Sequence, residues 1–215
     1  MTREDNYNLN KLVDEEEVSG VIKEMQKGKA PGPDGFNVDF FKAFWGIFKH
    51  DIIDVVDSRK NKIVLKAFNT SFISLIPKQD NAMTLYRFRP IALCNVVYKI
   101  ISKIIANRLK PLLPTLVSEE KTGYVECRQI LNNIIQAHEV VHSLKSKRQA
   151  SMIMQLDLEK AYDKLSWTYI RRVLIAYGFD HNWVRWVMAL VTTSSFSVLL
   201  NGSPSRTFKP LRGLR

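Results

Sequence analysis

Hydrophobic positions recur with helical spacing over six stretches of the chain. We therefore expect helices over residues 12–26, 37–58, 95–113, 129–145, 167–177 and 181–192. The second stretch carries an aromatic stripe that we interpret as core, formed by Phe40, Phe41, Phe44, Trp45, Phe48 and Ile52. His138 falls on the apolar side of the 129–145 helix, where a hydrogen-bonded core histidine is a better interpretation than a metal ligand.

Shorter stretches alternate with period two and predict strands. These cover residues 71–78 and 151–157, and two further short strands within 196–208 are joined by a turn at Asn201–Gly202. Three glycines and two prolines make residues 27–35 a loop, and residues 78–90 are expected to form a basic loop. Helices and strands are mixed without regular β–α–β alternation, which predicts an α+β fold.

Charge is distributed unevenly along the 215 residues, whose net charge is +11. Residues 1–57 hold 7 Lys and Arg against 12 Asp and Glu, whereas residues 58–215 hold 25 against 9. Such an excess favours a polyanionic partner, above all nucleic acid. A general solubility charge is the alternative that composition leaves open.

Cysteine content and hydropathy indicate an intracellular protein. Cys94 and Cys127 have no spacing typical of zinc sites, and we expect both to be reduced thiols. The polar start MTREDNYNLN is unlike a signal peptide, and residues 186–205 are too polar for a membrane span, so no membrane partner is expected. The basic run KSKR, residues 145–148, is too short to distinguish nucleus from cytoplasm.

The stretch QLDLEKAYDKLSW, residues 155–167, carries the candidate chemistry. Asp157 would end a strand, where a rigid backbone could present its carboxylate to a Mg²⁺ ion, with the Leu158 carbonyl as a second oxygen. The ring of Tyr162 could then lie against a sugar bound beside the metal. Asp163 is better explained as a helix cap or a local salt-bridge partner. A purely structural role for Asp157 stays open on these residues alone.

Several motifs together resemble the reverse transcriptases of plant LINE-type non-LTR retrotransposons. QLDLEKAYDKLSW resembles the first catalytic motif of that family. The other matching segments, in the family's order, are GKAPGPDGFNVDFFKAFW, FISLIPK, FRPIALCNVVYKIISKIIANRLKPLLP, RQILNNIIQAHEVVHSL and SFSVLLNGSPSRTFKPLRGLR. The resemblance extends from about residue 12 to residue 215.

The resemblance implies a fold and an organisation. We expect the fingers of a right-hand polymerase over roughly residues 12–150 and the first part of its palm over 151–215, preceded by a polar tail at 1–11. The implied activity is RNA-directed DNA synthesis by two-metal nucleotidyl transfer. The implied partners are an RNA template, a DNA primer and deoxynucleoside triphosphates.

The same resemblance implies roles for particular residues. Asp157 would bind the catalytic Mg²⁺ ions together with the Leu158 carbonyl. Tyr162 would screen the 2′ position of the sugar. Lys78 and Arg89 would face the incoming triphosphate or the template, although a solvated basic loop explains both residues equally well.

The sequence departs from the family pattern in ways that predict no polymerase activity for this chain alone. It stops at Arg215, before the Gln-Gly-Asp and Ala-Asp-Asp segments of the family, so we expect the fragment not to hold two Mg²⁺ ions. Glu126 and Cys127 stand where the family has Pro-Gly. The alternative function is a catalytically dead, basic RNA-binding remnant. An unpaired edge at residues 151–157 would also make the chain prone to aggregation.

Overall fold

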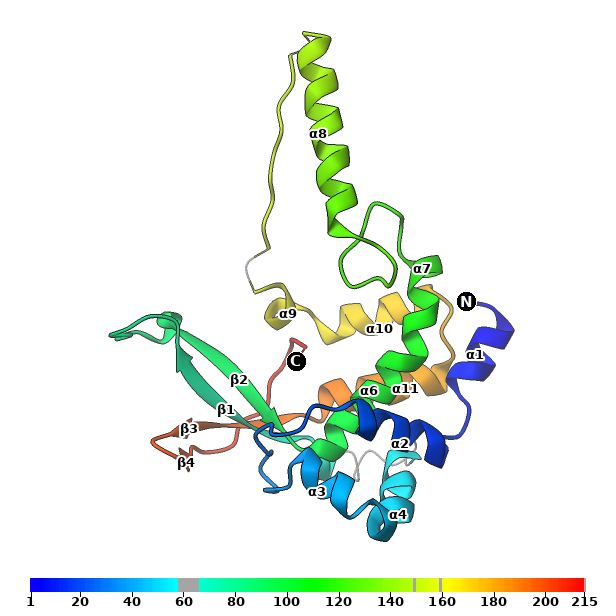
Figure 1. Ribbon diagram of the computed structural model, residues 1–215, viewed down its shortest axis with the longest axis vertical. Helices are drawn as coiled ribbons and strands as arrows, with labels where there is room; N and C mark the ends of the chain where they lie inside the picture. The colour runs from blue at the N-terminus through cyan, green and yellow to red at the C-terminus, as the bar shows by residue number, and fades with distance from the viewer. Residues whose placement is uncertain (58–65, 149, 159, 215) are drawn as a thin grey trace. The chain divides into compact units, whose positions relative to one another are not determined.

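The structure is a computed structural model that describes residues 1–57, 66–148, 150–158 and 160–214. The chain forms two compact units (Figure 1). The larger unit holds residues 1–106 and 162–215, and the smaller unit holds residues 107–161.

Most of the regular structure lies in the larger unit. Its elements, in chain order, are α1 (Arg3–Leu9), α2 (Glu15–Glu24), α3 (Val38–Ala43), α4 (Trp45–Asp57), β1 (Thr70–Pro77), the 3-10 turn η1 (Leu85–Arg87), β2 (Phe88–Cys94), α6 (Val96–Leu109), α9 (Ala161–Lys164), α10 (Trp167–Ala176), α11 (His181–Thr192), β3 (Ser195–Leu200) and β4 (Ser203–Pro204). Both α6 and α9 have residues in each unit, because the unit boundaries fall within them. In the described part of the chain, no helix combines the length and the apolar character needed to cross a bilayer.

Four strands form one mixed sheet in the order β2–β1–β3–β4 (Figure 1). β1 pairs antiparallel with β2 from Ser71 opposite Cys94 to Pro77 opposite Phe88, and parallel with β3 from Thr70 opposite Ser195. β3 and β4 form the hairpin predicted around Asn201–Gly202, whose φ angles of 50° and 81° suit a tight hairpin turn. The expected strand at 71–78 is confirmed. β2, by contrast, occupies part of the segment that we expected to be a basic loop up to residue 90.

Two helices supply much of the core of the larger unit. α6 buries the apolar face that its sequence pattern predicts, with Ile100, Ile101 and Ile104 fully inaccessible to solvent. α11 buries Trp183 and Trp186, whose rings meet edge to face with centroids 5.5 Å apart. The predicted helices at 95–113 and 181–192 are therefore confirmed, although α6 itself ends at Leu109.

The loop at residues 27–35 is held against the junction of β2 and α6. A Cβ atom on Gly32 would lie 2.4 Å from the backbone nitrogen of Asn95 and 2.6 Å from the carbonyl carbon of Cys94, so the close approach requires glycine. The buried Asn95 side chain accepts a hydrogen bond from the Asp34 amide (3.3 Å) and donates one to the Phe68 carbonyl (3.2 Å). The glycine-rich loop is thus a fixed structural element.

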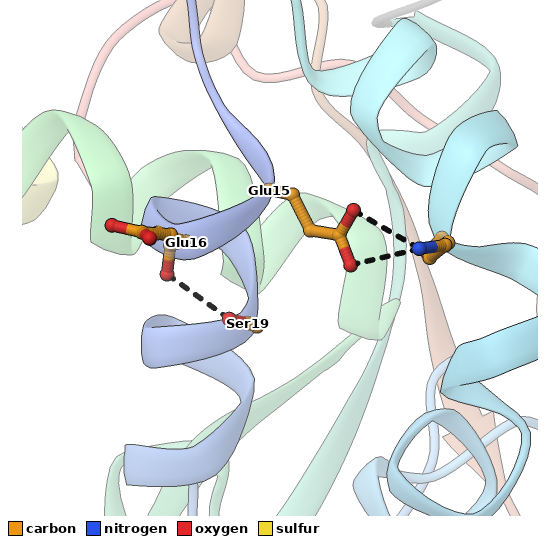
Figure 2. Close-up of polar contacts among 4 residues, drawn as sticks. Glu15, Glu16 and Ser19 are labelled. Atoms are coloured by element: carbon orange, nitrogen blue, oxygen red, sulfur yellow. Dashed lines mark hydrogen bonds and ion pairs between the residues drawn. The ribbon is translucent and has the colours of Figure 1, made fainter.

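The expected helix over 37–58 is divided into α3 and α4 at Phe44. Phe41 and Ile52 are buried as predicted, whereas Phe44 is exposed, so only part of the aromatic stripe is core. Residue 58 lies outside the described residues. Lys49 of α4 binds both carboxylate oxygens of Glu15 at 3.0 and 3.1 Å, and Ser19 donates to the Glu16 carbonyl within α2 (Figure 2).

Residues 1–11, expected to be a polar tail, include α1. Thr2 and Asp5 form a reciprocal capping box at its start, and Leu9 is buried. Asn6 connects this helix to the turn after α10, because its side chain donates to the Gly178 carbonyl (2.9 Å) and accepts from the Asp180 amide (2.8 Å).

The smaller unit is built from η2 (Lys110–Leu112), α7 (Leu113–Leu116) and α8 (Ile130–Ser146). α8 confirms the helix predicted over 129–145, yet none of its residues is buried. His138 is exposed, so its interpretation as a core histidine is wrong. Periodicity predicted the helix correctly, but it carries no information on what covers the apolar face.

The strand predicted over residues 151–157 is absent. This described segment has no regular secondary structure and pairs with none of the four strands. Its apolar side chains are exposed, including Met152 (83%), Met154 (68%) and Leu156 (81%). Alternation specifies which faces a strand would present, but a strand forms only where another strand satisfies its N–H and C=O groups.

Candidate nucleotide and nucleic-acid site

The outer end of the β1–β2 hairpin presents two of the predicted site residues. The Lys78 amide donates to the Arg87 carbonyl (2.8 Å), which continues the ladder past Pro77, and the Lys78 ammonium donates to the Tyr86 carbonyl (3.0 Å). Arg89 lies opposite Ile76, is exposed, and forms no ion pair with an acid in the described part of the chain. The hairpin therefore anchors Lys78 and leaves Arg89 available to an anion.

Tyr162 is placed by a set of backbone contacts that sequence reasoning missed. The Leu214 amide donates to the Tyr162 carbonyl (2.9 Å), the Gly213 amide to the Leu165 carbonyl (2.8 Å), and the Trp167 indole to the Gly213 carbonyl (2.8 Å). We call these three hydrogen bonds the 162–214 clamp. They fix the backbone of Tyr162 while 57% of the residue's surface stays exposed.

Gly213 makes the clamp possible. Its φ of 93° belongs to the region that favours glycine, and a Cβ atom there would lie 2.9 Å from the Asp163 carbonyl oxygen. The only signal in the sequence was an isolated glycine between charged and apolar residues in LRGLR, which does not identify its partner.

A cavity of about 390 Å³ lies between the sheet and this clamp. Ile73 and Ala92 of the hairpin strands line it together with Asp163, Arg212 and the aromatic ring of Tyr98. Within the described residues, the Asp163 carboxylate has neither a hydrogen bond nor an ion pair, so the expected local salt bridge is not formed. The cavity combines apolar walls with one acidic and one basic group, a lining typical of sites for small polar molecules.

Asp157 and Leu158 belong to the exposed irregular segment of the smaller unit. Among the described residues, no group of three or more His, Cys, Asp or Glu side chains could hold a metal ion. Glu159, a conceivable second carboxylate, lies outside the described residues. The described surroundings of Asp157 therefore do not fit a two-metal centre, which needs several oxygen ligands at fixed positions.

Comparison of the sequence with known proteins identifies the family of this chain. The sequence profile for "Reverse transcriptase (RNA-dependent DNA polymerase)" matches residues 76–215, more than half of the chain. The chain belongs to the reverse transcriptase family. The matched range includes the outer end of the hairpin, with the last two residues of β1 and all of β2, together with the 162–214 clamp and the Asp157 segment.

Individual relatives of this reverse transcriptase chain are proteins of mobile elements. The "Transposon TX1 uncharacterized 149 kDa protein" of Xenopus laevis is 27% identical over 202 residues, covering 93% of this chain and 15% of that protein. The "Retrovirus-related Pol polyprotein from type-1 retrotransposable element R2" of Popillia japonica is 24% identical over 143 residues, covering 66% and 20%. That from "type-2 retrotransposable element R2DM" of Drosophila melanogaster is 27% identical over 140 residues, covering 65% and 13%. The chain thus spans a fifth or less of these relatives, and its predicted resemblance to non-LTR retrotransposon RNA-directed DNA polymerases is confirmed.

The loop at Glu126–Cys127, where the resemblance leads us to expect Pro-Gly, has a residue in a backbone conformation that favours glycine. Cys127 adopts a φ of 64°, which glycine accepts freely and other residues adopt at a cost of about 1–2 kcal/mol. The neighbouring Arg128 guanidinium donates to four backbone carbonyls, those of Pro114, Val117, Ser118 and Lys121, at 2.6–3.0 Å. Arg128 therefore holds this loop together through charge-assisted hydrogen bonds.

Proposed function

We propose that this chain is the fingers and the first part of the palm of an RNA-directed DNA polymerase from a LINE-type non-LTR retrotransposon of a plant. The fingers would cover roughly residues 12–150 and the palm residues 151–215. The observation that carries the proposal is the reverse transcriptase match over residues 76–215, together with the order of the motifs along the chain. An intracellular location follows from the same proposal.

The proposed roles follow the positions of the side chains. Arg89, exposed and without an acidic partner in the described residues, would contact the phosphates of the triphosphate or the template, with Lys78 beside it on the hairpin. Tyr162 would meet the sugar, because the 162–214 clamp fixes its backbone and leaves its ring accessible. The primer and the RNA template would bind at these side chains.

Asp157 and the Leu158 carbonyl are the proposed metal ligands by resemblance. Because the described surroundings of Asp157 do not fit a two-metal centre, we propose that this 215-residue chain alone binds primer–template without extending it.

Primer extension on an RNA template, run beside a binding measurement, tests this proposal. With Mg²⁺ and deoxynucleotides, we expect binding of the RNA–DNA primer–template and no extension. Arg89→Gln should weaken binding several-fold, whereas Lys49→Gln, whose charge is already paired with Glu15, should not. DNA synthesis that disappears in Asp157→Ala would show that the chain is a competent polymerase, and the absence of any primer–template binding would refute the proposed function.

RNA binding without catalysis is a second candidate function. It is favoured by a specific observation: basic side chains such as Arg89 are exposed and have no acidic partner in the described residues, and those residues form no group of three or more potential metal ligands. Binding through phosphates predicts an affinity that falls steeply as salt increases. An affinity that does not change with salt would exclude it.

A further inference from the structure

A second basic surface lies on the larger unit, along the helices α10 and α11. These helices are consecutive, are in contact, and are joined by a short turn at residues 177–180 (Figure 1). A groove of about 530 Å³ runs along them, which we call the α10–α11 groove. The side chains of Arg171, His181, Arg185 and Thr192 form its exposed rim, and Val184 and Ala189 form its buried floor.

The groove follows one face of α11. His181, Arg185, Met188 and Thr192 are separated by four, three and four residues, the spacing that places side chains on the same side of a helix. Eleven residues of helix rise roughly 16 Å, which is enough to lie along several consecutive phosphates of a nucleic-acid strand. The apolar floor fixes the helix in the core, so the basic rim is presented on a rigid element.

The two arginines of the rim lack intramolecular counter-ions. Neither Arg171 nor Arg185 forms an ion pair or a side-chain hydrogen bond with any residue that the structure describes. Asp180, the acid next to the groove in sequence, is occupied by the Asn182 amide (2.8 Å) and the Asn10 side chain (3.2 Å).

The basic face of α6 provides the contrast. There, Lys103 pairs with Glu24 at 3.4 Å, and just beyond the helix Lys110 pairs with Glu126 at 2.9 Å. The positive charge of the chain is therefore partly neutralised by its own acids on α6, but not in the α10–α11 groove. Like charges held together on a rigid surface repel one another unless an anion binds between them.

We propose that the α10–α11 groove binds the phosphodiester backbone of an RNA strand, as a contact separate from the β1–β2 hairpin. Arg171 and Arg185 donate to phosphate oxygens in the charge-assisted geometry that guanidinium groups favour, whereas the Thr192 hydroxyl at the far end donates to the Met188 carbonyl (2.8 Å). Such contacts position a strand without reading its sequence. The choice of RNA rests on the proposed function, whereas the affinity of the groove for a phosphate chain rests on its own side chains.

Binding of a fluorescent oligouridine RNA to the 215-residue chain, measured over a series of KCl concentrations, tests the groove. Arg171→Gln with Arg185→Gln should lower affinity roughly three- to tenfold and reduce the salt slope by about 1.4, because a single strand contributes about 0.7 per phosphate contact. Arg172→Gln is the matched control, since it removes the same charge from the same helix but does not line the groove. Arg185→Lys keeps the charge and should therefore keep the salt slope of the unmodified chain.

A variant that keeps both arginines distinguishes a lost RNA contact from a loss of folding. Thr192→Glu places a negative charge in the groove and should also lower affinity, with an unchanged far-UV circular dichroism spectrum. If Arg172→Gln weakens RNA binding as much as the double variant, the charge acts diffusely and the proposal is wrong. It is equally wrong if the double variant and Thr192→Glu both bind RNA normally. An acidic protein segment would then be the better candidate ligand of the groove.

The hairpin variant separates this proposal from the proposed function. Loss of affinity in the groove variants but not in Arg89→Gln supports the groove and counts against the hairpin as a substrate contact. Loss in Arg89→Gln alone supports the hairpin and overturns the groove. Loss of affinity in both, with additive changes in salt slope, supports two separate contacts on one strand.

Discussion

The helices α6 and α8 have the same kind of sequence pattern, but only α6 buries its apolar face. Both show apolar residues at helical spacing, but α6 buries Ile100, Ile101 and Ile104 completely, whereas α8 leaves 65% of Ile130 and 49% of Ile134 exposed. α6 packs in the core of the larger unit. In the smaller unit the described residues provide no such cover, which shows that periodicity specifies a helix and not the surface that it packs against.

The largest effect should come from removing the same side chain in the two helices. Ile101→Ala leaves a cavity in a closed core and should lower the free energy of unfolding by about 2–5 kcal/mol. Ile134→Ala should change it by less than about 0.5 kcal/mol, because the side chain is already half exposed. Urea titrations followed by circular dichroism provide the measurement. Equal losses in the two variants would mean that α8 is buried in solution and would break the comparison.

The next largest effect on stability should come from close backbone packing in the larger unit. Gly32→Ala would force a Cβ atom into the backbone at Asn95 and should cost about 1–3 kcal/mol or more. Gly20→Ala in α2 is the control, since nothing lies within 4 Å of its Cβ position, and it should stabilise by up to about 1 kcal/mol. Thermal unfolding of the two variants should therefore shift in opposite directions, and a harmless Gly32→Ala would show that the loop is not held against β2.

Backbone strain in the smaller unit predicts a variant that is more stable than the unmodified chain. Cys127→Gly relieves the φ of 64° and should raise the local free energy of unfolding by about 0.5–1 kcal/mol, after allowing for the greater freedom of glycine in the unfolded chain. Hydrogen exchange of the amides near Arg128 measures this local change. Cys127→Ser keeps the Cβ atom and should give no gain, so equal protection in the two variants would contradict the strain.

The carboxyl of Asp34 should make a smaller contribution to stability, one that changes with pH. Burial raises its pKa above the ordinary value of 3.8, and the hydrogen bond from the Phe36 amide and the charge of Lys99 only partly offset this. The folded state thus binds the proton more tightly, so this contribution to stability is present below pH 3.8 and is lost as pH rises through the raised pKa.

Asp34→Asn removes that titration and keeps an oxygen for the Phe36 amide. Its melting temperature relative to the unmodified chain should be higher at neutral pH than at acid pH. Asp51→Asn, which alters an exposed carboxyl of α4, serves as the control. A relative melting temperature of Asp34→Asn that is constant across this pH range would show that the carboxyl is not buried in solution.

The smallest effect on the free energy of unfolding should come from a substitution in the exposed segment 151–157, which should have a large effect on solubility. Met154→Lys replaces an exposed apolar side chain, so the free energy of unfolding should stay within about 0.5 kcal/mol. The exposed apolar segment around it favours association between chains, and the added charge should reduce light scattering at high concentration. Unchanged scattering would mean that this segment does not drive association.

Sequence patterns predicted most of the helices, the first strand and the Asn201–Gly202 hairpin, because each depends on residues close in the chain. They did not predict β2, because Pro90 and the basic residues of this segment are typical of a loop. The strand forms because β1 pairs with it along its whole length. They also predicted a strand at Asp157 that did not form, because pairing depends on a partner distant in sequence. For the site, the motifs identified Lys78, Arg89 and Tyr162 as candidates, but the 162–214 clamp arises only when distant segments meet, and the α10–α11 groove only when two consecutive helices pack together.

The hydrogen bond from the Trp167 indole to the Gly213 carbonyl has a spectroscopic consequence. Trp183 and Trp186 are fully buried, whereas Trp167 and Trp45 are partly accessible, so in a Trp45→Phe variant the emission of Trp167 can be distinguished by its access to a soluble quencher. Since this bond belongs to the turn that fixes Tyr162, opening of the turn should change the polarity around the indole and shift its emission. The chain thus carries an intrinsic fluorophore that reports whether the residue proposed to meet the nucleotide sugar is held in place.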